Sequence, residues 1–143
     1  MFDIVPSAFT PLRSALAGGL LAAVALAVSP AHASDGCGGA IYDHNGSSVA
    51  IDHCTDTIRY VRPRSGMRRQ GARSGTLLFS GVGLDGSGRV SGTAYVFKRG
   101  CGPAGFHVSG RWRSSGLVLV GDAPVRGSGC RVTRYRRDVL NFN

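Results

Sequence analysis

The chain has 143 residues, with 17 lysines and arginines against 8 acidic residues, and a formal net charge of +9. All but one of the basic residues are arginine, and glutamate does not occur. The length is that of one domain, and the composition excludes catalytic sites that depend on a pair of glutamates.

Residues 1–33 are predicted to be a cleavable secretory signal peptide that forms a helix. Arg13 precedes an uncharged run over residues 14–30, and Ala31-His32-Ala33 supplies the small-x-small pattern that signal peptidase cuts. An uncleaved anchor is the alternative. The apolar stretch 15–28 is too short for it, because a membrane helix needs about 20 apolar residues.

We therefore expect a mature, exported domain over residues 34–143, located in the periplasm or secreted. Lipid attachment at Cys37 is disfavoured, because Asp35 breaks the apolar and small-residue pattern that such a cysteine requires. The mature domain would have no transmembrane span.

The four cysteines all follow the predicted signal, and an even number in an exported chain indicates disulfides. Asn45-Gly46 is a strong hairpin signal, because both residues tolerate the positive φ angles of a type I′ turn. Counting outwards from that turn places Cys37 opposite Cys54 on a non-hydrogen-bonded pair, where Cα atoms approach to about 4.5 Å. We therefore predict Cys37–Cys54 and, by elimination, Cys101–Cys130.

Short strands between turn signals make up the rest of the predicted domain. About eight or nine strands at this spacing indicate an all-β antiparallel fold, as a small barrel or, alternatively, a β-sandwich. In chain order they are residues 40–44, 47–53, 57–61, 76–82, 89–98, 106–113, 117–121, 130–136 and 139–142. A turn at Ser115-Gly116 would place Trp112, a predicted core anchor, opposite Leu119.

Arginines concentrate in two segments that are candidate anion-binding sites, because the planar guanidinium group suits phosphate and carboxylate. An acid-free loop holds the first set and the last predicted strands the second: Arg62, Arg64, Arg68, Arg69 and Arg73, then Arg131, Arg134 and Arg136. An anionic envelope polymer, a lipid or an acidic protein would fit such segments. For the overall excess, a GC-rich genome, which encodes arginine in preference to lysine, is the simpler explanation.

Catalytic residues are less evident. The only candidate catalytic cluster consists of Asp43, His44, Asp52 and His53. The hairpin register, however, puts each aspartate on the face opposite its neighbouring histidine. Turn capping by Asp43 and solvated histidines explain the cluster more simply. Among the other aspartates, Asp85 and Asp122 fall in predicted turns and Asp138 lies between the last two predicted strands. No pattern predicts a metal or another cofactor, and no specific nucleic-acid module is present.

Several motifs together resemble a group of small exported proteins of unassigned function from Gram-negative bacteria. They are Thr57-Ile58-Arg59-Tyr60-x-Arg62-Pro63, Gly75-Thr76-Leu77-Leu78-Phe79, Gly92-Thr93-Ala94-Tyr95-x-Phe97-Lys98-x-Gly100-Cys101, Val108-x-Gly110, Leu119-x-Gly121-x-Ala123-Pro124 and Cys130-x-Val132-x-x-Tyr135. The resemblance covers most of the mature chain. It implies a single exported β domain with paired cysteines, but no activity and no site residues.

The leading functional hypothesis is a non-enzymatic, exported binding domain, and the alternative is a small periplasmic hydrolase that uses aspartate and histidine. A lysozyme inhibitor is disfavoured, because lysozyme is itself basic and the strong positive charge of this chain would repel it. An enzyme should bring acidic and histidine side chains together in one concave pocket. A binding domain should present a continuous face of arginines.

Overall fold

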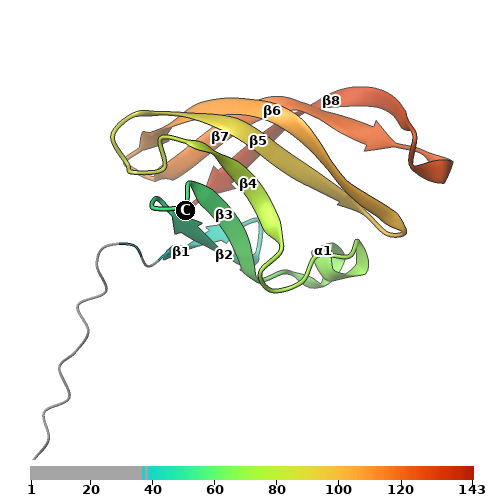
Figure 1. The fold of residues 1–143 in the computed structure, drawn as a ribbon, viewed down its shortest axis with the longest axis horizontal. Coiled ribbons are helices and arrows are strands. Elements are labelled where there is room, and N and C mark those ends of the chain that lie inside the picture. The colour runs from blue at the N-terminus through green and yellow to red at the C-terminus, as the bar shows by residue number, and fades with distance from the viewer. Residues whose placement is uncertain (1–36, 38) are drawn as a thin grey trace, which may run out of the picture. The chain divides into compact units, whose positions relative to one another are not determined.

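The domain consists of one antiparallel sheet. The computed structural model describes Cys37 and residues 39–143. Its eight strands follow the order of the sequence, each paired with the next (Figure 1). They are β1 (Ala40–His44), β2 (Ser47–Asp52), β3 (Thr57–Arg62), β4 (Leu77–Val82), β5 (Arg89–Lys98), β6 (Cys101–Arg113), β7 (Gly116–Arg126) and β8 (Val132–Phe142). A short helix, α1 (Ser65–Arg69), lies between β3 and β4, and a 3₁₀ turn, η1 (Ser128–Cys130), precedes β8.

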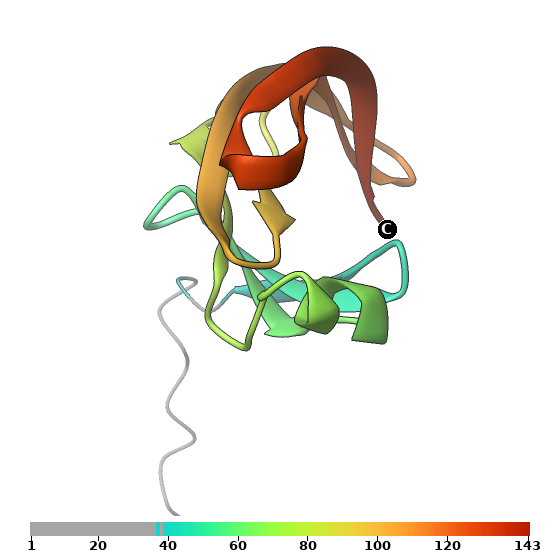
Figure 2. The same ribbon diagram turned by 90° about the vertical axis from the view of Figure 1, so that its right-hand side faces the viewer.

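The sheet curls into a half-barrel, seen from one end in Figure 2. Its first and last strands approach each other at one point, where Asp43 and Asn143 exchange both backbone hydrogen bonds, at 2.8 and 3.1 Å. The prediction of an all-β antiparallel barrel rather than a two-sheet sandwich is therefore confirmed. The predicted signal-peptide helix, residues 1–33, lies outside the described residues.

The predicted first hairpin and both disulfides are confirmed. His44 pairs with Ser47 and Ala40 with Ile51, across a turn in which Asn45 and Gly46 have φ angles of 52° and 79°. Cys37 bonds to Cys54 and Cys101 to Cys130, with Cα–Cα distances of 5.4 and 5.6 Å. Two such bonds indicate an oxidising compartment outside the cytoplasm.

The inner face of the sheet forms the core because alternate strand residues point inwards. Val49, Ile58, Phe79 and Leu119 are fully buried there. Phe79 lies over a pair of facing glycines, Gly81 on β4 and Gly92 on β5. A Cβ atom on either glycine would lie only 2.5 or 2.7 Å from Cζ of the Phe79 ring. The two glycines therefore make the space that this ring fills.

Replacing Gly81 tests this packing. In Gly81→Ala the new methyl group would lie 2.2 Å from the Ser91 carbonyl oxygen, so the sheet must shift. We expect the free energy of unfolding to fall by about 1–3 kcal/mol, the usual cost of overpacking, as measured by urea denaturation. Gly102→Ala is the control, because no atom lies within 4 Å of its added Cβ. Equal stabilities of the two variants would contradict the packing described here.

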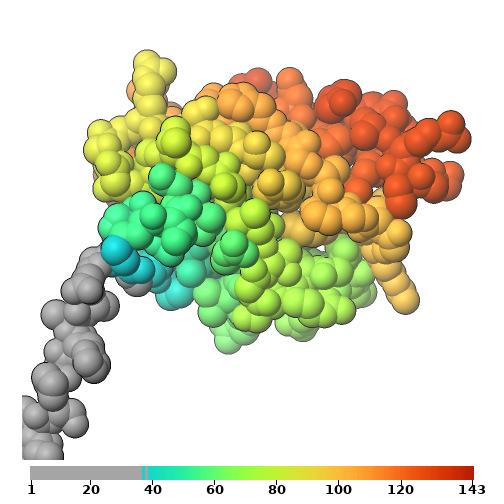
Figure 3. Space-filling model, viewed as in Figure 1, coloured from blue at the N-terminus to red at the C-terminus, as the bar shows by residue number. Residues whose placement is uncertain are grey.

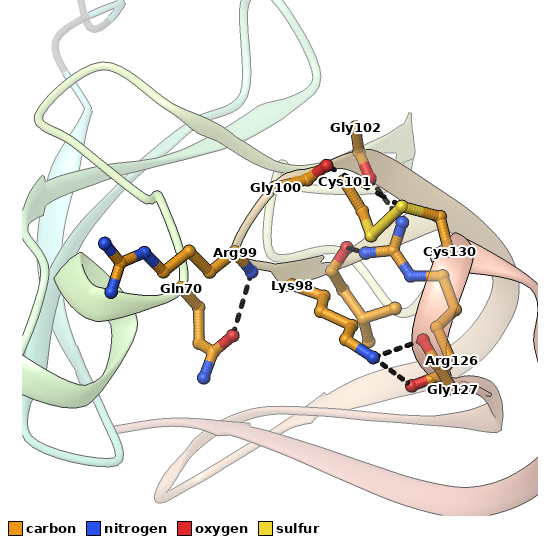
Figure 4. The surroundings of a disulfide bond; sticks show 10 residues. Gln70, Lys98, Arg99, Gly100, Cys101, Gly102, Arg126, Gly127 and Cys130 are labelled. Atoms are coloured by element: carbon orange, nitrogen blue, oxygen red, sulfur yellow. Dashed lines mark hydrogen bonds between the residues drawn. A yellow bond between two sulfur atoms is a disulfide. The ribbon is translucent and has the colours of Figure 1, made fainter.

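The sheet divides towards the end that carries α1. The β6–β7 ladder stops at Val108 opposite Gly121, while β6 continues along β5 and β7 continues along β8. The Cys101–Cys130 disulfide joins the two ribbons beyond that point (Figure 4). The Lys98 ammonium donates to the carbonyls of Arg126 and Gly127. Cross-links by side chains thus replace the missing ladder.

Arg126 adds to this cross-link from the opposite ribbon. Its guanidinium group donates to the carbonyls of Val96 and Gly102 (Figure 4). The Arg126 side chain therefore stabilises the fold through hydrogen bonds within the domain. It was not among the predicted anion-binding residues.

Three expectations for the last strands are wrong. The segments 130–136 and 139–142 form one strand, β8, and Asp138 lies inside it opposite Gly121. Asp122 is not in a turn but within β7. Strand β7 can pass through Pro124 because beyond Gly121 it pairs with β8 alone, so the missing N–H group can face away from its partner.

Trp112 is also displaced from the expected register. It pairs with Leu117 rather than Leu119, because the turn between β6 and β7 is formed by Ser114-Ser115. It does pack against the core, and its indole N–H donates to the Gly83 carbonyl at 3.2 Å.

Candidate functional site

The meander gathers both predicted arginine segments at one end of the half-barrel. Strands β3, β5 and β7 all run towards that end, so the connections that follow them lie there together, as Figures 2 and 3 show. We call it the basic end and define it by Arg62, Arg64, Arg68, Arg69, Arg73, Lys98, Arg99, Arg126, Arg131, Arg134 and Arg136. Arg99 is fixed beside the α1 segment, because its backbone N–H donates to the Gln70 side chain at 3.1 Å (Figure 4).

Aspartates cap turns at the opposite end. Asp52 accepts hydrogen bonds from the backbone of Cys54 and from the Thr55 hydroxyl, at 2.9 Å each. These hydrogen bonds lower the pKa of the Asp52 carboxyl group. Asp85 accepts hydrogen bonds from Ser87 in the β4–β5 turn. At the basic end Asp43 caps the β1–β2 turn and Asp138 pairs with Arg136, so the arginines there outnumber the carboxylates.

The arginines of the basic end divide into two kinds. Arg68 donates to the Pro63 carbonyl and Arg73 to the Arg68 carbonyl, both at 2.8 Å, so these two hold the α1 segment in place. The side chains of the other predicted residues make no hydrogen bond with the described part of the chain: Arg62, Arg64, Arg69, Arg131, Arg134 and Arg136. They are exposed and available to a partner.

Carboxylates hardly neutralise this end. Within the described residues the only ion pair joins Arg136 to Asp138, at 3.9 Å, and 66% of the Arg136 side chain is exposed. Exposed pairs of this kind contribute about 0–1 kcal/mol. Arg136 therefore remains able to contact an anion.

A cavity of about 450 Å³ opens within the half-barrel and reaches the basic end. Its wall combines polar and apolar groups, and Arg64 and Arg136, two of the predicted site residues, are part of it. The residues that line it are His44, Asn45, Tyr60, Arg64, Met67, Leu78, Tyr95, Val96, Phe97, Phe106, Ala123, Pro124, Val125, Arg136, Asp138, Val139 and Leu140. Sites for small ligands in proteins have cavities of this size.

Tyr60 and Arg64 form one polar part of the wall. Tyr60 is only 2% exposed, and its burial raises the pKa of the hydroxyl group to about 12, while the positive charge of Arg64 opposes this rise. Arg64 follows the buried Pro63, and its backbone N–H donates to the Ser47 hydroxyl at 3.0 Å. Ser47 is itself buried, so it fixes where the chain leaves β3.

His44 is the cavity residue that the sequence analysis placed wrongly. The side chain is partly buried rather than fully solvated. Its ring stacks on Phe142 at 4.8 Å, and Nδ1 donates to the Asn141 carbonyl at 2.9 Å. Since a carbonyl only accepts, Nδ1 carries the proton in the neutral ring and Nε2 remains free. The hairpin register could have predicted this position, because His44 lies on the same face of the sheet as Tyr42 and Val49.

The other members of the Asp/His cluster do not join this cavity. Asp43 caps the Asn45-Gly46 turn, as predicted, by accepting from the Gly46 N–H at 3.1 Å. Asp52 and His53 lie at the far end of β2. The carboxylate that does line the cavity with His44 is Asp138, which the sequence analysis had placed between strands.

His44 makes the stability of the domain depend on pH. Burial lowers the pKa of its ring from the usual 6.5; the nearby Asp138 and Asp43 raise it, and Arg64 lowers it. The unfolded chain then takes up the proton at a higher pH than the folded one. We expect the free energy of unfolding to decrease as the pH falls below about 6.5, until the folded form is protonated too.

The measurement is the urea midpoint between pH 5 and pH 8. His44→Gln should flatten this part of the profile, whereas His107→Gln, on the exposed side of β6, should leave it in place. The same profile in all three proteins would contradict the role of His44.

Among residues 37 and 39–143, no helix is long and apolar enough to cross a membrane, and no group of side chains is suited to hold a metal ion. Comparisons with protein-family models, with curated proteins and with solved structures found no match for this chain.

Proposed function

We propose that the chain is an exported binding domain, without enzymatic activity, that contacts an anionic component of the bacterial envelope through its basic end. The observation that carries this proposal is the set of exposed arginines there, of which Arg136 alone forms an ion pair within the described residues. Each guanidinium group can bind phosphate or carboxylate through two parallel hydrogen bonds. The signal peptide and the resemblance to small exported proteins, both predictions from the sequence, agree with an envelope location.

The distribution of charge indicates which end of the domain faces its partner. At the opposite end, Asp52 ends strand β2 and Asp56 and Asp85 lie in turns, whereas Asp43 caps the β1–β2 turn near Arg64. Such a separation steers an anionic surface towards the arginines and away from the acidic turns. The domain would therefore dock with α1 and the β7–β8 turn facing its partner.

Binding to phosphatidylglycerol vesicles tests the proposal. Neutralising Arg62, Arg69 and Arg134 to glutamine should remove about 1 kcal/mol per arginine, which amounts to roughly 100-fold weaker binding. These residues do not line the cavity. Co-sedimentation at two salt concentrations provides the affinities, and retention on heparin extends the test to a polymer.

The matched control neutralises three arginines at the opposite end, Arg89, Arg111 and Arg113. This variant loses the same charge but should keep most of its affinity. An equal loss in both variants would mean that net charge alone acts, and unchanged binding in the first would exclude the basic end. Retention of an acidic protein, but not of vesicles, would also overturn the proposal.

A hydrolase is the second candidate, because His44 and Asp138 line one cavity, as an enzyme of that kind requires. Three features oppose it. The His44 Nδ1 atom bonds to the Asn141 carbonyl and not to Asp138. The cavity lining contains no serine, threonine or cysteine, and a tyrosine with a pKa of about 12 is a poor nucleophile. Hydrolysis of a p-nitrophenyl ester that disappears in His44→Gln would favour the enzyme.

A further inference from the structure

We propose that the free edge of β8 binds an extended, acidic segment of another polypeptide, which adds to the sheet as an additional strand. Peptides bind in this way to sheets that leave one edge strand unpaired. This partner goes beyond the envelope docking proposed above, because it is recognised through backbone groups of the domain as well as through charge. A lipid surface has no backbone groups to match them.

Strand β8 is the last strand of the sheet (Figure 1), and only its C-terminal end meets β1. There Asn143 exchanges both backbone hydrogen bonds with Asp43, and the Asn141 carbonyl bonds to the His44 ring. Strand β1 ends at that histidine, because the chain then turns back to form β2. The rest of the β8 edge, residues 134–139, therefore has no neighbouring strand within the described part of the chain.

The alternation of the strand determines which backbone groups this edge presents. In an antiparallel sheet, successive residues direct their N–H and C=O groups to opposite sides. The Asn141 carbonyl faces β1, whereas the Phe142 carbonyl faces β7. The same alternation directs the backbone groups of Tyr135, Arg137 and Val139 to the free edge. No hydrogen bond joins these groups to the described residues, so they can pair with an added strand.

The side chains of β8 indicate a surface that a partner covers. Residues 132–137 are all exposed. Of the six large hydrophobic side chains that are exposed in the described residues, three belong to β8: Val132, Tyr135 and Val139, at 45%, 67% and 45%. Exposed apolar groups gathered in this way mark sites of protein–protein contact.

Charge selects an acidic partner. The free edge has three arginines, Arg134, Arg136 and Arg137. Two carboxylates lie beside them, Asp138 within β8 and Asp122 opposite Arg137 on β7. The arginines outnumber these carboxylates, and side chains of an added strand would lie directly opposite them. Opposite charges at such positions stabilise a pair of strands.

A second copy of the domain does not fit this edge. Two β8 edges would bring the same arginines together, and like charges opposite each other destabilise a pair of strands. Charged residues on edge strands prevent self-association in this way. An acidic strand meets no such repulsion.

The cavity of the half-barrel lies beside this edge and has room for side chains of the partner. Arg136, Asp138 and Val139 of β8 line it, and Arg64 lines it from the segment that follows β3. Alternate side chains of an added strand point to the same face of the sheet. One set would therefore face the cavity, where the arginines can bind carboxylates.

Fluorescence anisotropy of a labelled peptide of alternating glutamate and valine tests the proposal. The peptide should bind the protein saturably, with an affinity that falls as salt is added, because salt screens the charges of the arginines. The same peptide with lysine in place of glutamate should not bind. Failure of the acidic peptide to bind, or equal binding of the lysine peptide, would overturn the proposal.

Two substitutions at Arg137 separate the backbone from the charge. Arg137→Gln and Arg137→Pro both remove the guanidinium group, but only proline removes the N–H group that faces the free edge. The ladder with β7 does not use this N–H group, so the fold can accommodate the proline. Arg137→Pro should therefore bind the acidic peptide about tenfold more weakly than Arg137→Gln. Equal affinities, with native circular dichroism in both variants, would contradict binding at this edge.

Amide hydrogen exchange of the unaltered protein provides a second measurement, which does not depend on the folding of a variant. The N–H groups of Tyr135, Arg137 and Val139 should exchange rapidly and slow down when the peptide binds. The Leu140 N–H group, which faces β7, should be protected from the start. Unchanged exchange at the edge would exclude strand addition. Slowing that requires only a higher protein concentration would mean that a second copy occupies the edge.

Phosphatidylglycerol vesicles show whether this site and envelope docking are independent. Vesicles have no backbone groups, so they should bind Arg137→Gln and Arg137→Pro equally. A loss of vesicle binding in Arg137→Pro alone would show that the edge serves the membrane instead, and would overturn the assignment to a polypeptide.

Discussion

Replacing Cys101 and Cys130 with serine should lower the free energy of unfolding by about 3.6 kcal/mol. This value is the entropy that a cross-link across 29 residues removes from the unfolded chain. It is a large part of the 5–15 kcal/mol that stabilises a typical domain. Urea denaturation of the double variant, without added reductant, measures it.

The loss should also be local. The disulfide spans the region where β6 and β7 no longer pair, so Lys98 and Arg126 alone would hold the two ribbons together. Amide exchange should therefore accelerate most in the part of β8 that follows Val132. Serine at Cys37 and Cys54 is the comparison, since that bond closes 17 residues at the other side of the sheet. A Cys101/Cys130 variant that loses less than about 1 kcal/mol would contradict the account.

Phe142→Ala should cost about 3–5 kcal/mol, the usual loss for a buried aromatic ring. Phe142 is completely buried, pairs with Leu117 and stacks on His44 at 4.8 Å. It also precedes Asn143, which joins the last strand to Asp43 on β1. Its removal should therefore open the half-barrel as well as leave a void in the core.

Two readouts separate these effects. Urea denaturation measures the stability, and NMR titration of His44 should show its pKa moving back towards 6.5, because the ring loses the burial that lowers it. Tyr135→Ala is the control on the same strand; with 67% of Tyr135 exposed, its loss should stay within about 0.5 kcal/mol. If Phe142→Ala lowered the free energy of unfolding by only about 0.5 kcal/mol, β8 would not close the half-barrel.

Local signals in the sequence predict the first hairpin and the disulfides well. Asn45-Gly46 permits one turn type, and this fixes the register as far as Cys37 and Cys54. The turn after Trp112 is less defined, since Ser114-Ser115 and Ser115-Gly116 both suit a two-residue turn. Gly116 is the first residue of β7, opposite Arg113. A side chain at this position would collide with the Phe142 carbonyl, and this contact is visible only in the folded sheet.

The candidate site is less predictable because it depends on tertiary structure. The arginines of the β3–β4 connection and of β8 are far apart in sequence, and only the meander brings them to one end. Arg68 and Arg73 stabilise the α1 segment, because their side chains donate to the carbonyls of Pro63 and Arg68. The charge pattern of the sequence does not indicate this structural role. His44 and Asp138 meet in the cavity because β1 and β8 approach each other across the half-barrel.

The most direct test of the central claim is a map of the arginine side chains during binding. Nε–Hε resonances can be followed by NMR while phosphatidylglycerol nanodiscs are added to the domain. Docking through the basic end predicts that Arg62, Arg69 and Arg134 shift or broaden, while Arg89, Arg111 and Arg113 remain unchanged. Equal effects at both ends, or effects confined to the second set, would contradict it.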